Sequence, residues 1–160
     1  MFNIDEIFEI AEQIERNGVQ FYSKAAEKFH DYSKKSILLK LADMEKEHEK
    51  RFHEMRLELA KRESQISQFL DPQNEARLYL HSIANSKVFD LRADPLEKLR
   101  KVQTVQDLLR IAIDLEKDSI IFYLGIKEFV PSELGKDKID LIVKEEMGHV
   151  KILTDLMENL

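Results

Sequence analysis

The sequence has no cysteine among its 160 residues. This absence excludes a disulfide framework, a cysteine nucleophile and a cysteine-ligated zinc or iron–sulfur centre. Any metal ion must therefore bind to histidine and carboxylate side chains. Glycine occurs only 4 times and proline 3 times, so the chain has few turns, while 35% of its residues are charged and 43% are hydrophobic. This composition predicts an all-α protein rich in amphipathic helix.

Positive charge is also scarce: the 25 Lys and Arg residues are outnumbered by 31 Asp and Glu residues, which gives a net charge of −6. Such a chain lacks the positive field on which non-specific nucleic-acid binding depends, so we expect no nucleic-acid partner. No run approaches the roughly 18 apolar residues of a membrane span, and the N-terminus lacks a signal-peptide pattern. We expect a single domain over residues 1–160, a cytoplasmic location and no membrane association.

Turn-forming residues divide the chain into four long helical segments. They cluster at residues 30–33, at Asp71-Pro72, at Asp94-Pro95 and between Pro131 and Gly135. The first of these clusters offers Ser33 as a cap for the second helix. We predict helices over about 3–29, 34–61, 104–130 and 136–159. The crossover over about 62–103 is predicted to contain one short helix, from Pro72 to Phe89.

The four helices are two copies of one helical hairpin. The first predicted helix matches the third, and the second matches the fourth, at the same offset of 101 positions and without a gap. Glu15 thus matches Glu116, and Tyr22 matches Tyr123. A hairpin repeat of this kind predicts a four-helix bundle. Its two hairpins are joined by a connection long enough to run the length of the bundle.

Each predicted helix has an apolar face with polar residues only near its middle. Residues three or four positions apart share a helix face, so these polar side chains point into the bundle. They are two single glutamates and two Glu-x-x-His pairs: Glu15, Glu116, Glu45 with His48, and Glu146 with His149. Buried carboxylates need a cationic partner, and these faces contain no Lys or Arg, so we predict bound metal ions. Oxygen and imidazole ligands suit iron, manganese or a mixed pair.

The strings AEQIERNGVQFY, LADMEKEHEKRF, AIDLEKDSIIFY and VKEEMGHVKIL resemble rubrerythrin-type (erythrin) di-iron domains of the ferritin-like superfamily. The resemblance covers all four helices and implies a ferritin-like bundle with two iron ions per chain, with Fe/Mn or zinc as alternatives. It implies that Glu15 and Glu116 are terminal ligands and that Glu45 and Glu146 bridge the two ions. His48 and His149 would each bind one ion. Tyr22 and Tyr123 resemble groups that support catalysis beside the bridging carboxylates.

The resemblance implies a di-iron oxidoreductase, a non-haem peroxidase active in oxidative stress, that reduces hydrogen peroxide or dioxygen as a ferrous pair is oxidised. Full-length rubrerythrins add a rubredoxin domain with four cysteines, so this chain requires a separate electron donor such as a rubredoxin or a reductase. Rubrerythrins also carry an extra Glu where this chain has Ile113, which removes the residue associated with a redox-linked ligand switch. Glu12, at the repeat-related position, is the alternative candidate for that role, but we interpret it as an exposed helix residue.

Two other functions remain open from the sequence. A ferroxidase or iron-storage protein of the ferritin or bacterioferritin type would use the same ligands, and a non-catalytic metal-binding scaffold would keep the bundle for partner binding. We expect a homodimer. The crossover is richer in apolar residues than a solvated loop requires, and we expect them to cover the bundle or the dimer partner: Leu78, Leu80, Ile83, Val88, Phe89 and Leu91. Glu145 is assigned to a charged outer face, with the orientation of a ligand histidine as the alternative.

Overall fold

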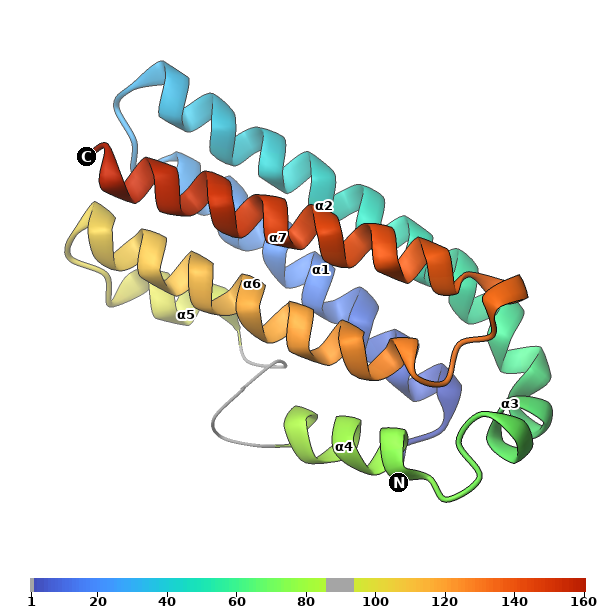
Figure 1. Cartoon of the computed structure of the whole chain (residues 1–160). Coiled ribbons are helices and arrows are strands. Elements are labelled where there is room, and N and C mark those ends of the chain that lie inside the picture. The colour runs from blue at the N-terminus through green and yellow to red at the C-terminus, as the bar shows by residue number, and fades with distance from the viewer. Residues whose placement is uncertain (1, 86–93) are drawn as a thin grey trace.

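The computed structural model describes residues 2–85 and 94–160, apart from the side chains of residues 67–69. Four long helices dominate it: α1 (Ile4–Ala26), α2 (Tyr32–Leu59), α6 (Val105–Lys127) and α7 (Lys136–Glu158). Figure 1 shows them side by side as one bundle. All regular elements in these two stretches are helical, so the predicted all-α class is confirmed. None of these helices is long and apolar enough to span a membrane.

Side-chain caps set the starts of α1, α2 and α6. In α1, the Asn3 side chain accepts a bond from the Glu6 amide and the Glu6 carboxylate accepts one from the Asn3 amide, both at 2.8 Å. The second helix begins two residues earlier than predicted, because Asp31 rather than Ser33 is its cap and accepts from the Ser33 amide at 2.8 Å. The first helix ends at Ala26, three residues short of the predicted end.

The two hairpins predicted from the repeat are both present, because α1 packs mainly against α2 and α6 against α7. Contacts of α1 with α6 and of α2 with α7 join them. The connection from α2 to α6 spans the length of the bundle, since α4 lies at the end where α2 finishes and α5 at the end where α6 begins (Figure 1). One long crossover between two hairpins is the ferritin-like topology.

The crossover holds more helix than the single short one predicted. Besides a 3₁₀ turn at Ala60–Arg62, its described residues form three helices: α3 (Glu63–Phe69), α4 (Glu75–Ala84) and α5 (Pro95–Arg100). The start predicted at residue 72 is wrong, because the Asp71 carboxylate accepts bonds from the amides of Ala76 (3.1 Å) and Arg77 (3.3 Å) and starts α4 later. The signal for α5 was available in the sequence, because Asp94 caps it and Pro95 occupies its first turn.

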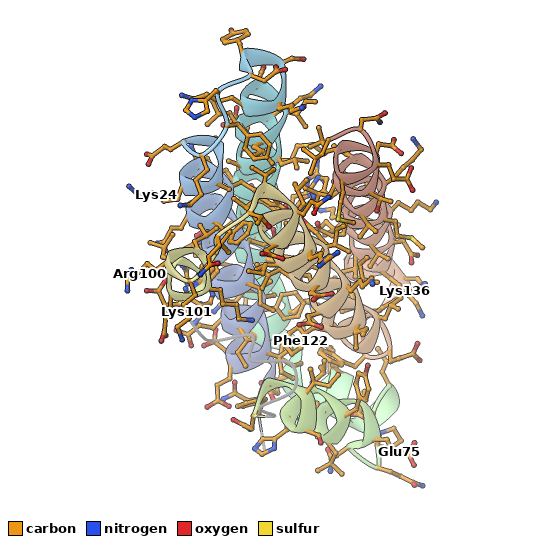
Figure 2. The ribbon with its side chains drawn as sticks, turned by 90° about the vertical axis from the view of Figure 1, so that its left-hand side faces the viewer. Lys24, Glu75, Arg100, Lys101, Phe122 and Lys136 are labelled. Carbon is orange, nitrogen blue, oxygen red and sulfur yellow. The ribbon has the colours of Figure 1, made fainter. Side chains whose placement is uncertain are left out.

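Helix α4 packs on α6, and α5 packs on α1. Figure 2 shows α4, marked by Glu75, across one end of the bundle, and α5, marked by Arg100 and Lys101, beside α1. Within the crossover, Leu80 and Ile83 are buried in the core, whereas Leu78 is 55% exposed and does not cover the bundle. The predicted covering role of residues 88, 89 and 91 falls outside the described residues.

The core consists of two apolar clusters, one toward each end of the bundle. One contains Phe8, Phe52 and Phe122 and is covered by Leu80 of α4. Phe122 is labelled in Figure 2, where it lies inside the bundle. The other cluster is built around Phe21 and includes Leu99 of α5. Each long helix contributes to both clusters, and the polar residues in the middle of the helices separate them. The fold therefore places this polar layer away from both ends of the bundle.

Candidate metal centre

Six acidic and imidazole side chains meet in the polar layer. Each is at most 4% exposed, and each long helix contributes at least one: Glu15 (α1), Glu45 and His48 (α2), Glu116 (α6), Glu146 and His149 (α7). Every metal-ligating candidate identified in the sequence is thus part of one cluster. The helical spacing explains this, because Glu and His three residues apart lie on the same face of their helix.

The cluster divides into two groups of four ligands. One ligand atom from each of Glu15, Glu45, His48 and Glu146 lies within 4.8 Å of the others, and the same holds for the second group: Glu45, Glu116, Glu146 and His149. We call these groups the His48 position and the His149 position. Glu45 and Glu146 belong to both. Two positions that share two carboxylates match the way in which such residues bridge a pair of metal ions in ferritin-like proteins.

The central atoms approach one another closely without forming hydrogen bonds. His48 Nδ1 lies 2.7 Å from Glu146 Oε1, and His149 Nδ1 lies 2.9 Å from Glu146 Oε2 and 3.0 Å from Glu45 Oε1. Within the described part of the chain, none of these atoms has a hydrogen-bond partner, and all are buried. Leaving a buried polar atom unpaired costs on the order of 1–3 kcal/mol. A cation between them would satisfy the whole set, so these residues fit a metal centre.

The two shared carboxyl groups have strongly perturbed acidities. Burial raises the pKa of Glu45 well above its usual 4.5, and the charges of Glu146, Glu15 and Glu116 raise it further. Burial raises the pKa of Glu146 well above 4.5 in the same way, with further contributions from Glu116 and Glu15. Burial would also raise the pKa of Glu116, but its contacts with Glu146 and His149 outweigh this effect and lower it. The shared carboxyls therefore hold protons that a metal ion would displace.

The two histidines also favour a positive charge at the centre. Burial by itself lowers the pKa of His48, but the neighbouring carboxylates, Glu15 first, raise it overall. Burial opposes the charging of His149 as well, and the pKa of this imidazole is nevertheless raised by Glu116, Glu146 and Glu45. Protons and metal ions would compete for the same nitrogen atoms, so metal affinity at this centre should increase with pH.

Two buried tyrosines connect the hairpins at the centre. The Tyr22 hydroxyl donates to Glu116 Oε1, and the Tyr123 hydroxyl donates to Glu15 Oε1. Both tyrosines also feel the charges of the shared carboxylates Glu45 and Glu146, but each donates its hydrogen bond to the single glutamate of the facing helix. Burial, together with the negative charge of the bonded glutamate, raises the pKa of both phenols well above 10.0. Both hydroxyl groups thus remain protonated and act as donors.

Glu145 reaches from α7 to the outer edge of a histidine on α2. Its Oε2 lies 2.6 Å from His48 Nε2 and accepts a bond from Arg51 Nη1 at 2.9 Å. The structure thus shows the alternative interpretation of Glu145, orientation of a histidine, rather than a purely solvent-facing role. Burial would raise the pKa of Glu145, but His48 and Arg51 lower it overall. The carboxylate is therefore ionised where it meets the imidazole.

Glu12 is buried, not exposed as predicted. Only 4% of it is accessible, and its carboxylate contacts His53 Nδ1 at 2.9 Å and Arg56 Nη1 at 3.1 Å between α1 and α2. These partners engage Glu12 away from the polar layer, and it belongs to neither four-ligand group. Ile113, at the repeat-related position, packs in an apolar cluster. The sequence signal that could have revealed this burial is the pair of basic residues on α2, His53 and Arg56, that face α1.

A small cavity of about 40 Å³ adjoins the centre, between α1, α6 and the start of α5. Glu45 and Glu116 line it on the side of the centre, and Gly18, Ser119 and Pro95 contribute to its walls. A cavity needs about 10–15 Å³ to hold a water molecule, so this one has room for at least one small molecule. The close approach of Glu45 to α1 depends on Gly18, because a Cβ there would lie 2.9 Å from Glu45 Oε2.

No protein-family model matches this chain, and no curated protein matches it. Among solved structures, it is similar to a protein from Thermotoga maritima that is assigned provisionally as a ferritin-like diiron-carboxylate protein. The TM-score is 0.69 and the identity 28%, over 98% of this chain and 95% of that one. The likeness confirms the ferritin-like fold and supports the ferritin-like superfamily without distinguishing its branches. Together with the buried Glu/His cluster, it fits a di-iron function.

Proposed function

We propose that this protein is a di-iron carboxylate oxidoreductase of the rubrerythrin type that reduces hydrogen peroxide or dioxygen. The observation that carries this proposal is the pair of buried four-ligand groups that share Glu45 and Glu146 and whose central atoms lack partners within the described residues. Two ferrous ions held there would together supply the two electrons that, with two protons, convert hydrogen peroxide to two water molecules.

The protein contributes a fixed environment in which the ligand side chains are buried. Tyr22 and Tyr123 each donate a hydrogen bond to a glutamate on the facing helix and so orient Glu116 and Glu15 toward the centre. Apolar clusters on both sides of the polar layer exclude bulk water. Within this environment, ligand geometry depends little on solvent, and the electrostatic attraction between carboxylates and cations is stronger than in water.

The cavity beside Glu45 and Glu116 supports a small oxidant as the substrate. Its volume of about 40 Å³ has room for a molecule as small as hydrogen peroxide or dioxygen. A molecule in this cavity would touch one shared carboxylate and one carboxylate of the His149 position. We therefore propose that the oxidant approaches the centre between α1 and α6.

The electron donor is proposed to be a separate protein, such as a rubredoxin or a reductase. The chain has no cysteine from which to build an iron–sulfur or rubredoxin-type centre of its own. We also propose that the protein acts as a homodimer. Sedimentation or light scattering measures this state directly, and a monomer would contradict it.

The proposal is tested by metal loading followed by oxidation. Metal-free protein is reconstituted with Fe²⁺ under anaerobic conditions, its iron content is measured by mass spectrometry, and one equivalent of hydrogen peroxide is added. We expect about two iron ions per chain and ferric oxo-bridged absorption within seconds. The matched variants are E45Q, which removes a shared ligand, and E158Q, which removes the same charge from the exposed end of α7.

Three outcomes would contradict the proposal. Iron content no higher in the native protein than in E45Q would show that the cluster is not a metal centre. Bound iron that does not respond to peroxide or dioxygen would favour a scaffold. Uptake of many ions per chain in a cage-sized assembly would instead indicate a ferroxidase or storage protein.

A further inference from the structure

The two metal positions are built from repeat-related ligands, yet their histidines are held differently. The outer nitrogen of His48, Nε2, lies 2.6 Å from Glu145 Oε2, and Arg51 Nη1 donates to the same oxygen at 2.9 Å. The outer nitrogen of His149 is buried and has no hydrogen-bond partner in the described part of the chain. The imidazole of His48 is thus held at its outer nitrogen, whereas that of His149 has no such contact among the described residues.

The sequence explains this difference. At the repeat offset of 101 positions, Glu145 corresponds to Met44 and Arg51 corresponds to Ile152. Neither methionine nor isoleucine offers the strong acceptor that an imidazole N–H requires. The difference between the two positions is therefore encoded by residue type and does not depend on the rotamer of a single side chain.

The hydrogen bonds that the two tyrosines donate at the centre are the same for both positions. Tyr22 bonded to Glu116 and Tyr123 bonded to Glu15 are related by the repeat, so each position has one such contact. Glu45 and Glu146 belong to both positions, so each position has the same two shared carboxylates. The pair formed by Glu145 and Arg51 is consequently what distinguishes the hydrogen bonding of the two histidines.

A carboxylate that accepts the outer N–H of a ligating imidazole fixes the ring and its tautomer and makes the inner nitrogen more basic. Such partners typically change metal affinity by about 10–100-fold. Arg51 balances the negative charge of Glu145, so the effect arises from orientation and basicity rather than from net charge. We infer that Glu145, held by Arg51, is a positioning residue that makes the His48 position the one that a divalent cation fills first. This inference rests on the proposed metal centre.

The test is an anaerobic titration of the metal-free, full-length protein with Co²⁺, followed by calorimetry and by the visible absorption of the bound ion. We expect two binding steps whose affinities differ by about tenfold or more. The E145Q variant should weaken the tighter step by about tenfold and leave the weaker step unchanged. The matched control is E158Q, which removes the same charge from an exposed site on α7 and should leave both steps unchanged.

Three further variants assign the steps. H149A should keep the tighter step, and H48A should lose it. M44E places a carboxylate at the position related to Glu145 and should strengthen the weaker step. Circular dichroism of each variant verifies that the helices are intact, and M44E tests the inference by a gain of affinity that misfolding would not produce.

The results separate this inference from the proposed function. If the native protein binds no Co²⁺, the metal centre itself is refuted, and the inference with it. If two ions bind with equal affinity, if E145Q behaves like E158Q, or if H48A retains the tighter step, the metal centre stands and the role of Glu145 is overturned.

Discussion

Replacing Gly18 by alanine should separate metal affinity from stability. In α1, a Cβ at this position would lie 2.9 Å from Glu45 Oε2, 3.1 Å from its Cγ and 3.2 Å from its Cδ. Ordinary contact begins at 3.4 Å, so the carboxylate must retreat by about 0.5 Å. Metal–ligand distances tolerate deviations of only about 0.2 Å. Since Glu45 belongs to both positions, G18A should weaken the binding of both metal ions.

The expected changes in metal affinity and in stability follow from this geometry. Loss of correct placement for one shared ligand should lower the affinity for each ion by about tenfold or more. Without metal, the Glu45 side chain is free to move aside, and alanine is favoured over glycine inside a helix by about 1 kcal/mol. The metal-free variant should therefore be as stable as the native protein or up to about 1 kcal/mol more stable.

The assay combines urea unfolding of the metal-free protein with Co²⁺ titration. Gly148 provides a matched control in the middle of α7, because a Cβ there would have no neighbour within 4 Å. G148A should gain stability without losing affinity. Native-like affinity of G18A for both ions would refute the reasoning, since it would show that Glu45 does not need its observed place beside α1.

Three other predictions concern protons and buried charges. The pKa values of Glu45 and Glu146 are raised well above 4.5, so the folded metal-free protein holds protons that the unfolded chain releases. Its melting temperature should thus fall as pH rises from about 5 to 8, and bound Co²⁺ should abolish the fall; a flat profile without metal would contradict this. E45Q mimics the protonated acid, so its free energy of unfolding in urea should decline less steeply with pH, by up to about 1.4 kcal/mol per pH unit. A slope equal to that of the native protein would contradict this. R56M removes the 3.1 Å partner of buried Glu12 as well as the bonds of Arg56 to Asp5, and should cost about 1–3 kcal/mol in urea unfolding. E12Q in the same chain should recover the part of this cost that is due to Glu12, and no recovery would contradict the reasoning.

The sequence alone was sufficient for the bundle and for the identity of the clustered residues. The helical period places residues three positions apart, such as Glu45 and His48, on one face of their helix. The constant offset of 101 positions places their counterparts on the related hairpin. Composition by itself excluded cysteine ligands, because the chain contains no cysteine. These inferences succeed because they depend on residue content and on spacing along one helix, which the sequence specifies directly.

Features that depend on facing helices required the tertiary structure. Tyr22 lies on the same helix as Glu15 but bonds to Glu116, and Glu145 is next to Glu146 but reaches His48 on another helix. Glu12 is buried because basic residues of α2 face it. Such contacts are set by the rotation and separation of packed helices, which spacing along a single helix does not specify. The sequence therefore determined which residues surround the centre, and helix packing decided which of them hold one another.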